Sequence, residues 1–147
     1  KGTDLDMVSR ILDNLRAAGI AAYVYLLFGT PTETLEEARQ TLEFTVKHSQ
    51  AITFLNLAVF NLPLQSPESE HLELASFYEG DLALYSDFVH PQGWGRRQVR
   101  SFLDREFRRH PAIAPIINED PPFFTSNHAP LVAGSAMNKN ININTKS

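Results

Sequence analysis

The chain has 147 residues, and its 13 Lys and Arg against 17 Asp and Glu give a formal net charge of −4. A composition with 43% hydrophobic and 20% charged residues is typical of one globular domain and excludes a disordered or fibrous chain. Because the chain has no cysteine, it holds no disulfide, thiolate zinc site, cysteine nucleophile or cysteine-ligated iron-sulfur cluster.

Two further features bear on location and completeness. No apolar run reaches the roughly 20 residues needed to cross a bilayer, and the start at Lys1 lacks a signal segment. We therefore expect a cytoplasmic protein with no membrane partner. The chain does not begin with methionine, so we expect it to be a fragment of a longer protein.

The first two expected elements are a helix and a strand. Leucine and valine recur at spacings of three or four over residues 4–18, with Thr3 or Asp4 as N-cap and Gly19 as the stop, which predicts an amphipathic helix. The apolar run 20–28 predicts a strand that is covered on both faces, as strands of parallel sheets are.

A second helix and strand follow. Thr34 and Glu37 form a capping box, which predicts a helix that ends near residue 48. Its inward-facing residues are expected to be Leu35, Ala38, Leu42 and Val46. Residues 52–60 predict a second apolar strand. The alternation of helix and strand predicts an α/β fold with parallel strands.

The second half of the chain changes in character. A proline-bounded loop is expected over 61–67. Residues 68–90 carry six acids and no Lys or Arg, and their apolar residues recur at helical spacing, which predicts a helix with a break near Gly80. After a turn around Trp94, residues 96–110 predict an arginine-rich helix. An acidic helix followed by a basic one predicts an antiparallel helical hairpin.

The turn after the first strand is the most informative stretch. Gly29 allows a ligand to approach the backbone, Pro31 restricts the chain, and the helix that follows has free N–H groups suited to an anion. The alternative is a purely structural turn that leads into a capped helix.

The faces of the two strands add candidate residues. Asn56 alternates with aliphatic residues, so it is expected to face a polar interior. Tyr23, Tyr25 and Leu27 share one face of the earlier strand, where two phenols can line a cleft for a flat polar ligand. The alternative is that the tyrosines place their hydroxyl groups at the edge of the core.

Other classes of site find little support. The interspersed acids favour intramolecular pairing of the arginines over nucleic-acid binding, and the five histidines are scattered singly, which argues against a metal site. The serine-hydrolase and Walker A motifs are absent. Asn127 and His128 lie in a late segment that either straps the domain or closes the mouth of a barrel.

Four stretches together resemble a radical S-adenosylmethionine enzyme core, closest to the subfamily that often carries a cobalamin-binding domain. They are Lys1-Gly2, the helix end A-A-G-I, the strand Y-V-Y-L-L-F-G-T-P-T-E-T and the later N-L-A-V-F-N-L-P. The resemblance implies the last two βα units of a partial (β/α)6 TIM-type barrel over residues 1–67. A helical extension would then occupy 68–133 and a flexible tail 134–147.

The resemblance also implies site residues. Leu27 and Gly29 match the family's fifth-strand pattern G-x-I-x-G-x-x-E, in which the isoleucine packs on adenine, while Tyr25 replaces its first glycine and Glu33 sits one place late. Asn61 and Leu62, at the end of the sixth strand, would border the cofactor. With the two residues predicted from the strand faces, the candidate cofactor-binding residues are Tyr25, Leu27, Gly29, Asn56, Asn61 and Leu62.

The implied function belongs to the parent protein. A 4Fe-4S cluster would be held by a C-x-x-x-C-x-x-C loop outside this chain, with S-adenosylmethionine, an unknown small-molecule substrate and cobalamin as candidate ligands. The chain alone would wall the cleft without catalysis, and its partners would be the rest of the barrel or a second copy paired through an exposed strand edge. The alternative function is a noncatalytic protein-interaction module.

Overall fold

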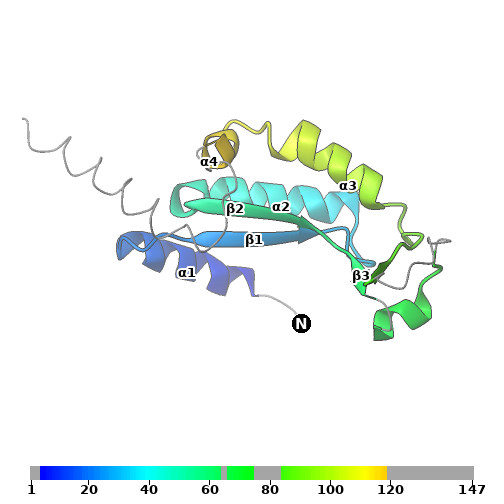
Figure 1. Cartoon of the computed structure of the whole chain (residues 1–147). Coiled ribbons are helices and arrows are strands. Elements are labelled where there is room, and N and C mark those ends of the chain that lie inside the picture. The colour runs from blue at the N-terminus through cyan, green and yellow to red at the C-terminus, as the bar shows by residue number, and fades with distance from the viewer. Residues whose placement is uncertain (1–3, 64–65, 75–83, 119–147) are drawn as a thin grey trace, which may run out of the picture. The chain divides into compact units, whose positions relative to one another are not determined.

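The computed structural model describes residues 4–63, 66–74 and 84–118, which form a mixed α/β structure of helices and small sheets (Figure 1). The chain divides into two compact units. The first contains Lys1–Tyr25, Phe44–Asn56 and His110–Ser147, and the second contains Leu26–Glu43 and Leu57–Arg109. Each unit therefore combines stretches that are far apart in the sequence.

The first unit begins with α1 (Leu5–Ala17). The Asp4 carboxylate accepts hydrogen bonds from the amides of Asp6 and Met7 at 3.0 and 3.2 Å, so it satisfies two donors of the first turn. The helix ends before Gly19, whose φ of 67° is accessible to glycine without steric cost. The predicted helix is confirmed, with Asp4 as its N-cap.

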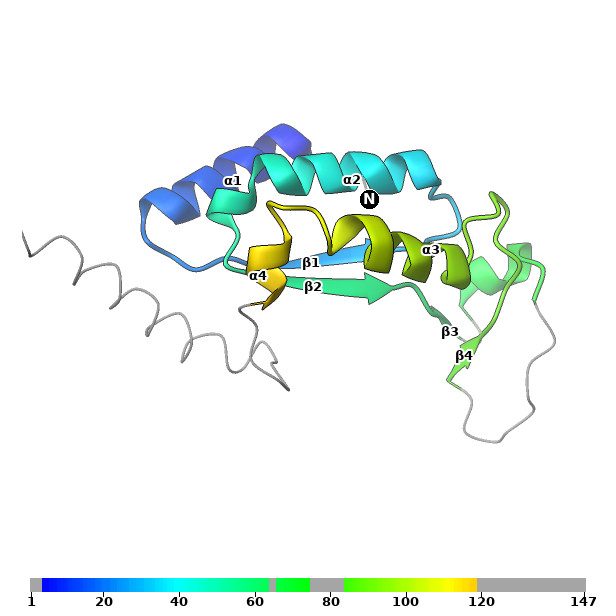
Figure 2. The ribbon, with the colours of Figure 1, turned by 90° about the horizontal axis from the view of Figure 1, so that it is seen from above.

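β1 (Tyr23–Phe28) and β2 (Phe54–Val59) form a two-stranded sheet. In the first unit the Phe54 amide donates to the Ala22 carbonyl at 3.1 Å, and in the second the Phe60 amide donates to the Phe28 carbonyl at 2.7 Å. Donor and acceptor advance by the same number of residues from one bond to the next, so the strands are parallel, as Figure 2 shows. Parallel pairing is therefore confirmed.

α2 (Leu35–Lys47) connects the two strands. The Thr34 amide donates to Glu37 Oε2 at 2.8 Å, and the Glu37 amide donates to Thr34 Oγ1 at 3.2 Å. This reciprocal pair is the predicted capping box. Ala38 is fully buried as expected, whereas Leu35 is 37% exposed, so the prediction of an inward Leu35 was wrong. Leu35 is the first residue of α2, so no preceding turn of the helix covers its side chain.

The expectation that β1 is covered on both faces was also wrong. Phe28 is fully buried and packs against Phe102 and Phe107, with ring centroids 6.1 and 5.5 Å away. On the opposite face Tyr25 is 59% and Leu27 53% exposed. Alternate strand residues point to opposite faces, and among the described residues only the Phe28 face has a packed layer in the second unit.

The acidic segment departs most from its prediction. Its described residues form a 3-10 turn at Pro67–His71 and a short strand β4 (Tyr85–Ser86), which pairs antiparallel with β3 (Leu62–Pro63). An isolated bridge joins Leu74 to Phe88. The helix predicted over 68–90 is therefore wrong where the structure describes it, and with it the helical hairpin. Residues 75–83, including Gly80, lie outside the described residues.

The arginine-rich helix is confirmed. α3 (Arg96–Phe102) continues into a π-helical turn (Leu103–Phe107), and a last short helix, α4 (Ala114–Asn118), belongs to the first unit. The wider π turn keeps Leu103 and Phe107 buried on one side. Glu106 of the π turn pairs with Arg39 of α2. Within the described residues, no arginine of this helix forms an ion pair with the acidic segment.

The two sheets have two strands each, and the described residues contain no barrel. None of the helices in these ranges is long and apolar enough to cross a membrane. The predicted tail at 134–147, together with Asn127 and His128, lies outside the described residues. The division into 1–67, 68–133 and 134–147 stays a prediction.

Candidate functional site

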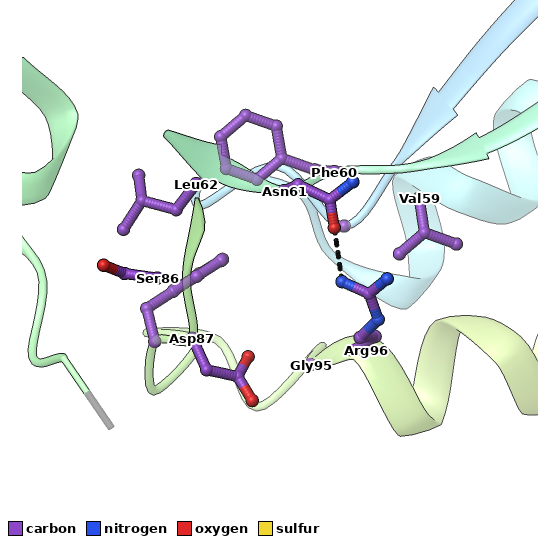
Figure 3. Close-up of a pocket in the computed structure, with 10 residues that line it drawn as sticks. Val59, Phe60, Asn61, Leu62, Ser86, Asp87, Gly95 and Arg96 are labelled. Carbon is purple, nitrogen blue, oxygen red and sulfur yellow. Dashed lines mark hydrogen bonds between the residues drawn. The ribbon is translucent and has the colours of Figure 1, made fainter. Parts of the chain in front are cut away.

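A shallow cleft of about 20 Å³, room for about one water molecule, lies in the second unit where β1 and β2 end (Figure 3). Three of the six predicted site residues line it: Gly29, Asn61 and Leu62. The carboxyl ends of parallel strands are where ligand sites of α/β folds collect. The location therefore agrees with the place where we expected a site, and the ligand roles of these residues stay predictions.

Gly29 forms the part of the cleft contributed by the end of β1. Its φ of 81° lies in the left-handed region, and a Cβ atom there would come within 3.2 Å of Val99 Cγ2. A side chain would therefore be both strained and crowded. The Gly29 amide donates a short hydrogen bond to the Glu33 carboxylate, which fixes the turn.

Glu33 connects this turn to a distant part of the chain. Besides the Gly29 amide, Glu33 Oε2 accepts a hydrogen bond from Trp94 Nε1 at 2.8 Å. The Trp94 indole is 5% exposed and packs edge-on against Phe102, with ring centroids 5.7 Å apart. The Glu33 carboxylate thus organises the turn and already has two N–H partners, although it sits one place late in the family pattern.

His90 closes the same network from the other side. Its Nδ1 atom accepts hydrogen bonds from the amides of Gln92 and Trp94 at 3.1 and 3.2 Å, and its Nε2 atom lies 2.8 Å from the Thr30 carbonyl. Only the neutral tautomer with hydrogen on Nε2 satisfies all three contacts. The buried imidazole therefore joins the turn after β1 to the turn before α3.

Arg96 and Asp87 supply the charges of the cleft. The Arg96 guanidinium donates a short hydrogen bond from Nη1 to Asn61 Oδ1, which the dashed line in Figure 3 marks. Asp87 follows β4 and borders the same cleft. Both side chains are exposed. Sequence reasoning grouped these two residues with a basic helix and an acidic segment and missed them as site residues.

The other three predicted site residues, Tyr25, Leu27 and Asn56, lie on β1 and β2. Tyr25 stacks at a tilt on Tyr23, with ring centroids 4.9 Å apart, and Tyr23 also lies 5.8 Å from the Phe54 ring. Strand alternation places Asn56, which is half-buried, on the Phe54 face. Leu27, two residues after Tyr25, lies on the same face of β1 as Tyr25. None of Tyr25, Leu27 and Asn56 lines the cleft.

A serine and a histidine also meet in the first unit. His48 Nε2 lies 3.0 Å from Ser9 Oγ, and the Ser9 hydroxyl donates to the Leu5 carbonyl at 2.9 Å. Since the hydroxyl hydrogen is used in the helix, the imidazole donates to Ser9 and does not act as its base. This pair is structural. Within the described residues, no group of His, Asp and Glu is arranged to hold a metal ion.

One ion pair shifts the pKa of a side chain. Arg39 and Glu106 form a two-pronged contact, with Nε 3.1 Å from Oε2 and Nη2 3.2 Å from Oε1. The hydrogen bond and charge of Glu106 raise the pKa of Arg39 above its ordinary value. The pair joins α2 to the π turn and lies apart from the residues that line the cleft.

No local motif marked the residues that organise the cleft. Thr30 and His90 are 60 positions apart, and Glu33 and Trp94 are 61 apart. Their pairing depends on tertiary structure, which a single sequence does not reveal. The only usable signal was the Trp94 turn between two glycines.

Comparison of the chain with protein-family models, curated proteins and solved structures found no match. Any assignment of function therefore rests on the residues and their arrangement.

Proposed function

We propose that the chain is the C-terminal part of a radical S-adenosylmethionine enzyme, where it walls the cofactor cleft and shapes the substrate pocket. In this proposal residues 1–67 supply the last two βα units of a partial (β/α)6 barrel. The chain has no cysteine, so it contributes no ligand to the 4Fe-4S cluster and is not catalytic alone. The parent protein would supply the cluster loop and, where used, cobalamin.

The observation that carries the proposal is the open face of a parallel sheet. In a barrel, one face of each strand packs on helices and the other faces the interior. Phe28 packs on α3, whereas Tyr25 and Leu27 are more than half exposed. Such a face fits the wall of an interior that further strands would complete.

The free edge of the sheet supports the same reading. β1 has β2 as its one neighbour in the described residues, so its other edge is available for a further strand. Met7 and Ile11 on α1 are 52% and 49% exposed at a spacing of four. Exposed edges and apolar stripes of this kind are normally covered. The rest of the barrel would cover them.

The cofactor role is assigned to the predicted residues. Leu27 would pack on adenine from the open face, and Gly29, Asn61 and Leu62 would border the cofactor at the strand ends. When bound, S-adenosylmethionine with the cluster would supply the radical chemistry. This chain's residues would orient the cofactor and exclude water.

The test uses the full-length parent, reconstituted anaerobically with iron and sulfide, with this chain as control. Calorimetry should detect S-adenosylmethionine binding to the parent and little or none to the chain, and reductive cleavage should follow in the parent alone. Leu27→Asp in the parent should weaken binding, whereas the matched change Leu35→Asp, on a helix, should not. A reconstituted parent that holds no cluster and binds no cofactor would end the proposal.

The second candidate is a noncatalytic interaction module. Arg97, Arg100 and Arg105 are exposed on α3 and the π turn, and none of them forms an ion pair in the described part of the chain. An exposed strand edge also allows a dimer. The reconstitution experiment separates the two functions, because a parent that holds no cluster and binds no S-adenosylmethionine would favour the module.

A further inference from the structure

The helical stretch 96–109 carries more positive charge than the chain neutralises. It contains six arginines, no lysine and two acids. Both acids are already paired: Asp104 Oδ1 lies 3.7 Å from Arg108 Nη1, and Glu106 forms its two-pronged contact with Arg39. The composition predicted pairing of these arginines within the chain, and in the described residues that pairing uses up the acids of the stretch before its arginines.

Three arginines of α3 and the π turn keep an unpaired charge. They are Arg97, Arg100 and Arg105, which form no ion pair or side-chain hydrogen bond within the part of the chain that the structure describes. All three side chains are exposed. Each guanidinium group therefore has its five N–H donors available to a partner from solvent.

Two of these arginines border one shallow, open groove of about 520 Å³ on the outer side of the helix. The groove is lined by Arg97, Gln98, Ser101, Asp104 and Arg105. Arg97, Ser101 and Arg105 recur at a spacing of four, which places them along one helix face. Eight residues separate the two arginines, about 12 Å at 1.5 Å per residue. The groove thus has a cation at each end and a hydroxyl group between them.

The outer side of this stretch offers no apolar anchor. Its apolar residues are Val99, Phe102, Leu103 and Phe107, and all four are buried. The core of a protein interface is rich in apolar side chains and depleted of charges, and a helix that lies in a membrane surface needs an apolar face. A phosphodiester backbone needs neither, because arginines and neutral donors bind it. The composition of the groove therefore favours nucleic acid over a protein or a membrane.

We propose that this face of α3 and the π turn binds the phosphodiester backbone of a nucleic acid. Arg97 and Arg105 would each contact a phosphate, since the planar fork of arginine matches phosphate oxygens, and the Ser101 hydroxyl would donate between them. The groove has no aromatic side chain on which a base could stack, so binding is independent of sequence. The inference does not rest on the proposed function, because it requires neither a cluster nor further strands.

The experiment titrates the ¹⁵N-labelled 147-residue chain with a short DNA duplex, a single strand of the same sequence and a glutamate-rich peptide of equal net charge, followed by NMR. Duplex and single strand share the phosphodiester backbone, and the tighter of the two identifies the form that is bound. Saturable shifts should fall on Arg97 and Arg105 Nε–H and on the Ser101 amide. Affinity should decrease about tenfold between 50 and 200 mM salt, as expected for two phosphate contacts.

Two charge-matched double variants locate the binding. Arg97→Gln with Arg105→Gln should remove most of the salt dependence and lower the affinity at low salt at least about tenfold. Arg10→Gln with Arg16→Gln removes the same charge from exposed positions on α1 and should change the affinity less than about twofold. Ser101→Glu, which adds a carboxylate between the arginines, tests the groove independently if the double variant perturbs folding, and it should also weaken binding.

Three results would overturn the proposal. The first is the absence of saturable shifts with either nucleic acid. The second is a glutamate-rich peptide that binds as tightly as the nucleic acids, which would assign the groove to an acidic protein. The third is an equal loss of affinity in the α1 double variant, which would mean that the overall charge of the chain, and not this face, determines binding.

Discussion

Trp94 Nε1 donates a 2.8 Å hydrogen bond to the Glu33 carboxylate, across 61 residues of sequence. The same carboxylate accepts the Gly29 amide, so one side chain joins the end of β1 to the turn before α3. Both ends of this connection adjoin the cleft. Its loss should therefore affect stability and the geometry of the cleft together.

We expect Trp94→Phe to lower the free energy of unfolding by about 1–3 kcal/mol, the range for losing a hydrogen bond to a charged partner. The phenyl ring keeps much of the packing against Phe102. Urea unfolding of Trp94→Phe, Glu33→Ala and the double variant measures the coupling energy. Additive single effects would mean that the indole and the carboxylate do not interact.

Gly29→Ala should be more harmful than Gly93→Ala. Both glycines have positive φ, 81° and 68°, so each substitution carries a backbone cost of about 1–2 kcal/mol. At Gly93 a Cβ atom meets nothing within 4 Å, whereas at Gly29 it meets Val99 Cγ2 at 3.2 Å. Unfolding midpoints of the two variants compare them directly. If both variants lose the same stability, the Val99 side chain moves away from the new methyl group at no cost in free energy.

The capping box allows a local test. Thr34→Ala removes the hydroxyl that accepts the Glu37 amide at 3.2 Å, and such changes cost about 0.5–2 kcal/mol. Asp4→Ala at the start of α1 should cost a similar amount because it also removes a cap. Chemical denaturation monitored by circular dichroism measures both. If neither variant lowers the free energy of unfolding, the two caps do not stabilise their helices.

These caps also show which features a sequence reveals. Thr34 and Glu37 are three residues apart, so their pairing is a local property of the chain, and both the helix and its start could be predicted. The bridge between Leu74 and Phe88 depends on a distant pairing that no periodicity marks. The residues before Leu74 have helical spacing but form a 3-10 turn after Pro67 instead. Tertiary pairing overrode local propensity there.

The lining of the cleft was anticipated only in part. The family resemblance singled out Gly29, Asn61 and Leu62, and all three line the cleft where strands end. Arg96 and Asp87 enter it only because β4 pairs with β3 and α3 follows a tight turn. Neither contact leaves a signal in spacing or composition, so the charges of the cleft could not be predicted.

The Arg39–Glu106 pair should respond to salt rather than to moderate pH changes. Glu106 raises the pKa of Arg39, so the stabilisation is present below the ordinary pKa of arginine and is lost only at strongly alkaline pH. Both side chains are nearly half exposed, so ions should screen their attraction. The effect of Arg39→Gln on the urea midpoint should shrink at high salt. An undiminished effect would assign the contribution to packing of the arginine stem.

The two faces of β1 should respond differently to substitution. In the isolated chain, Tyr25→Ser and Leu27→Ser should each change the free energy of unfolding by less than about 0.5 kcal/mol, as exposed positions do. Phe28→Ala, on the buried face, should cost about 3–5 kcal/mol because it leaves a cavity between Phe102 and Phe107. Urea unfolding of the three variants provides the comparison.

The same variants in the longer parent test whether that face is covered. If further strands complete a barrel, Leu27→Ser should become destabilising there by about 1.5–3 kcal/mol, because a leucine buried in the parent would be replaced by a polar side chain. Phe28→Ala should cost the same in both proteins, since its contacts lie within this chain. A Leu27→Ser variant that remains neutral in the parent would mean that the face stays open to solvent, which favours an interaction surface over a barrel interior.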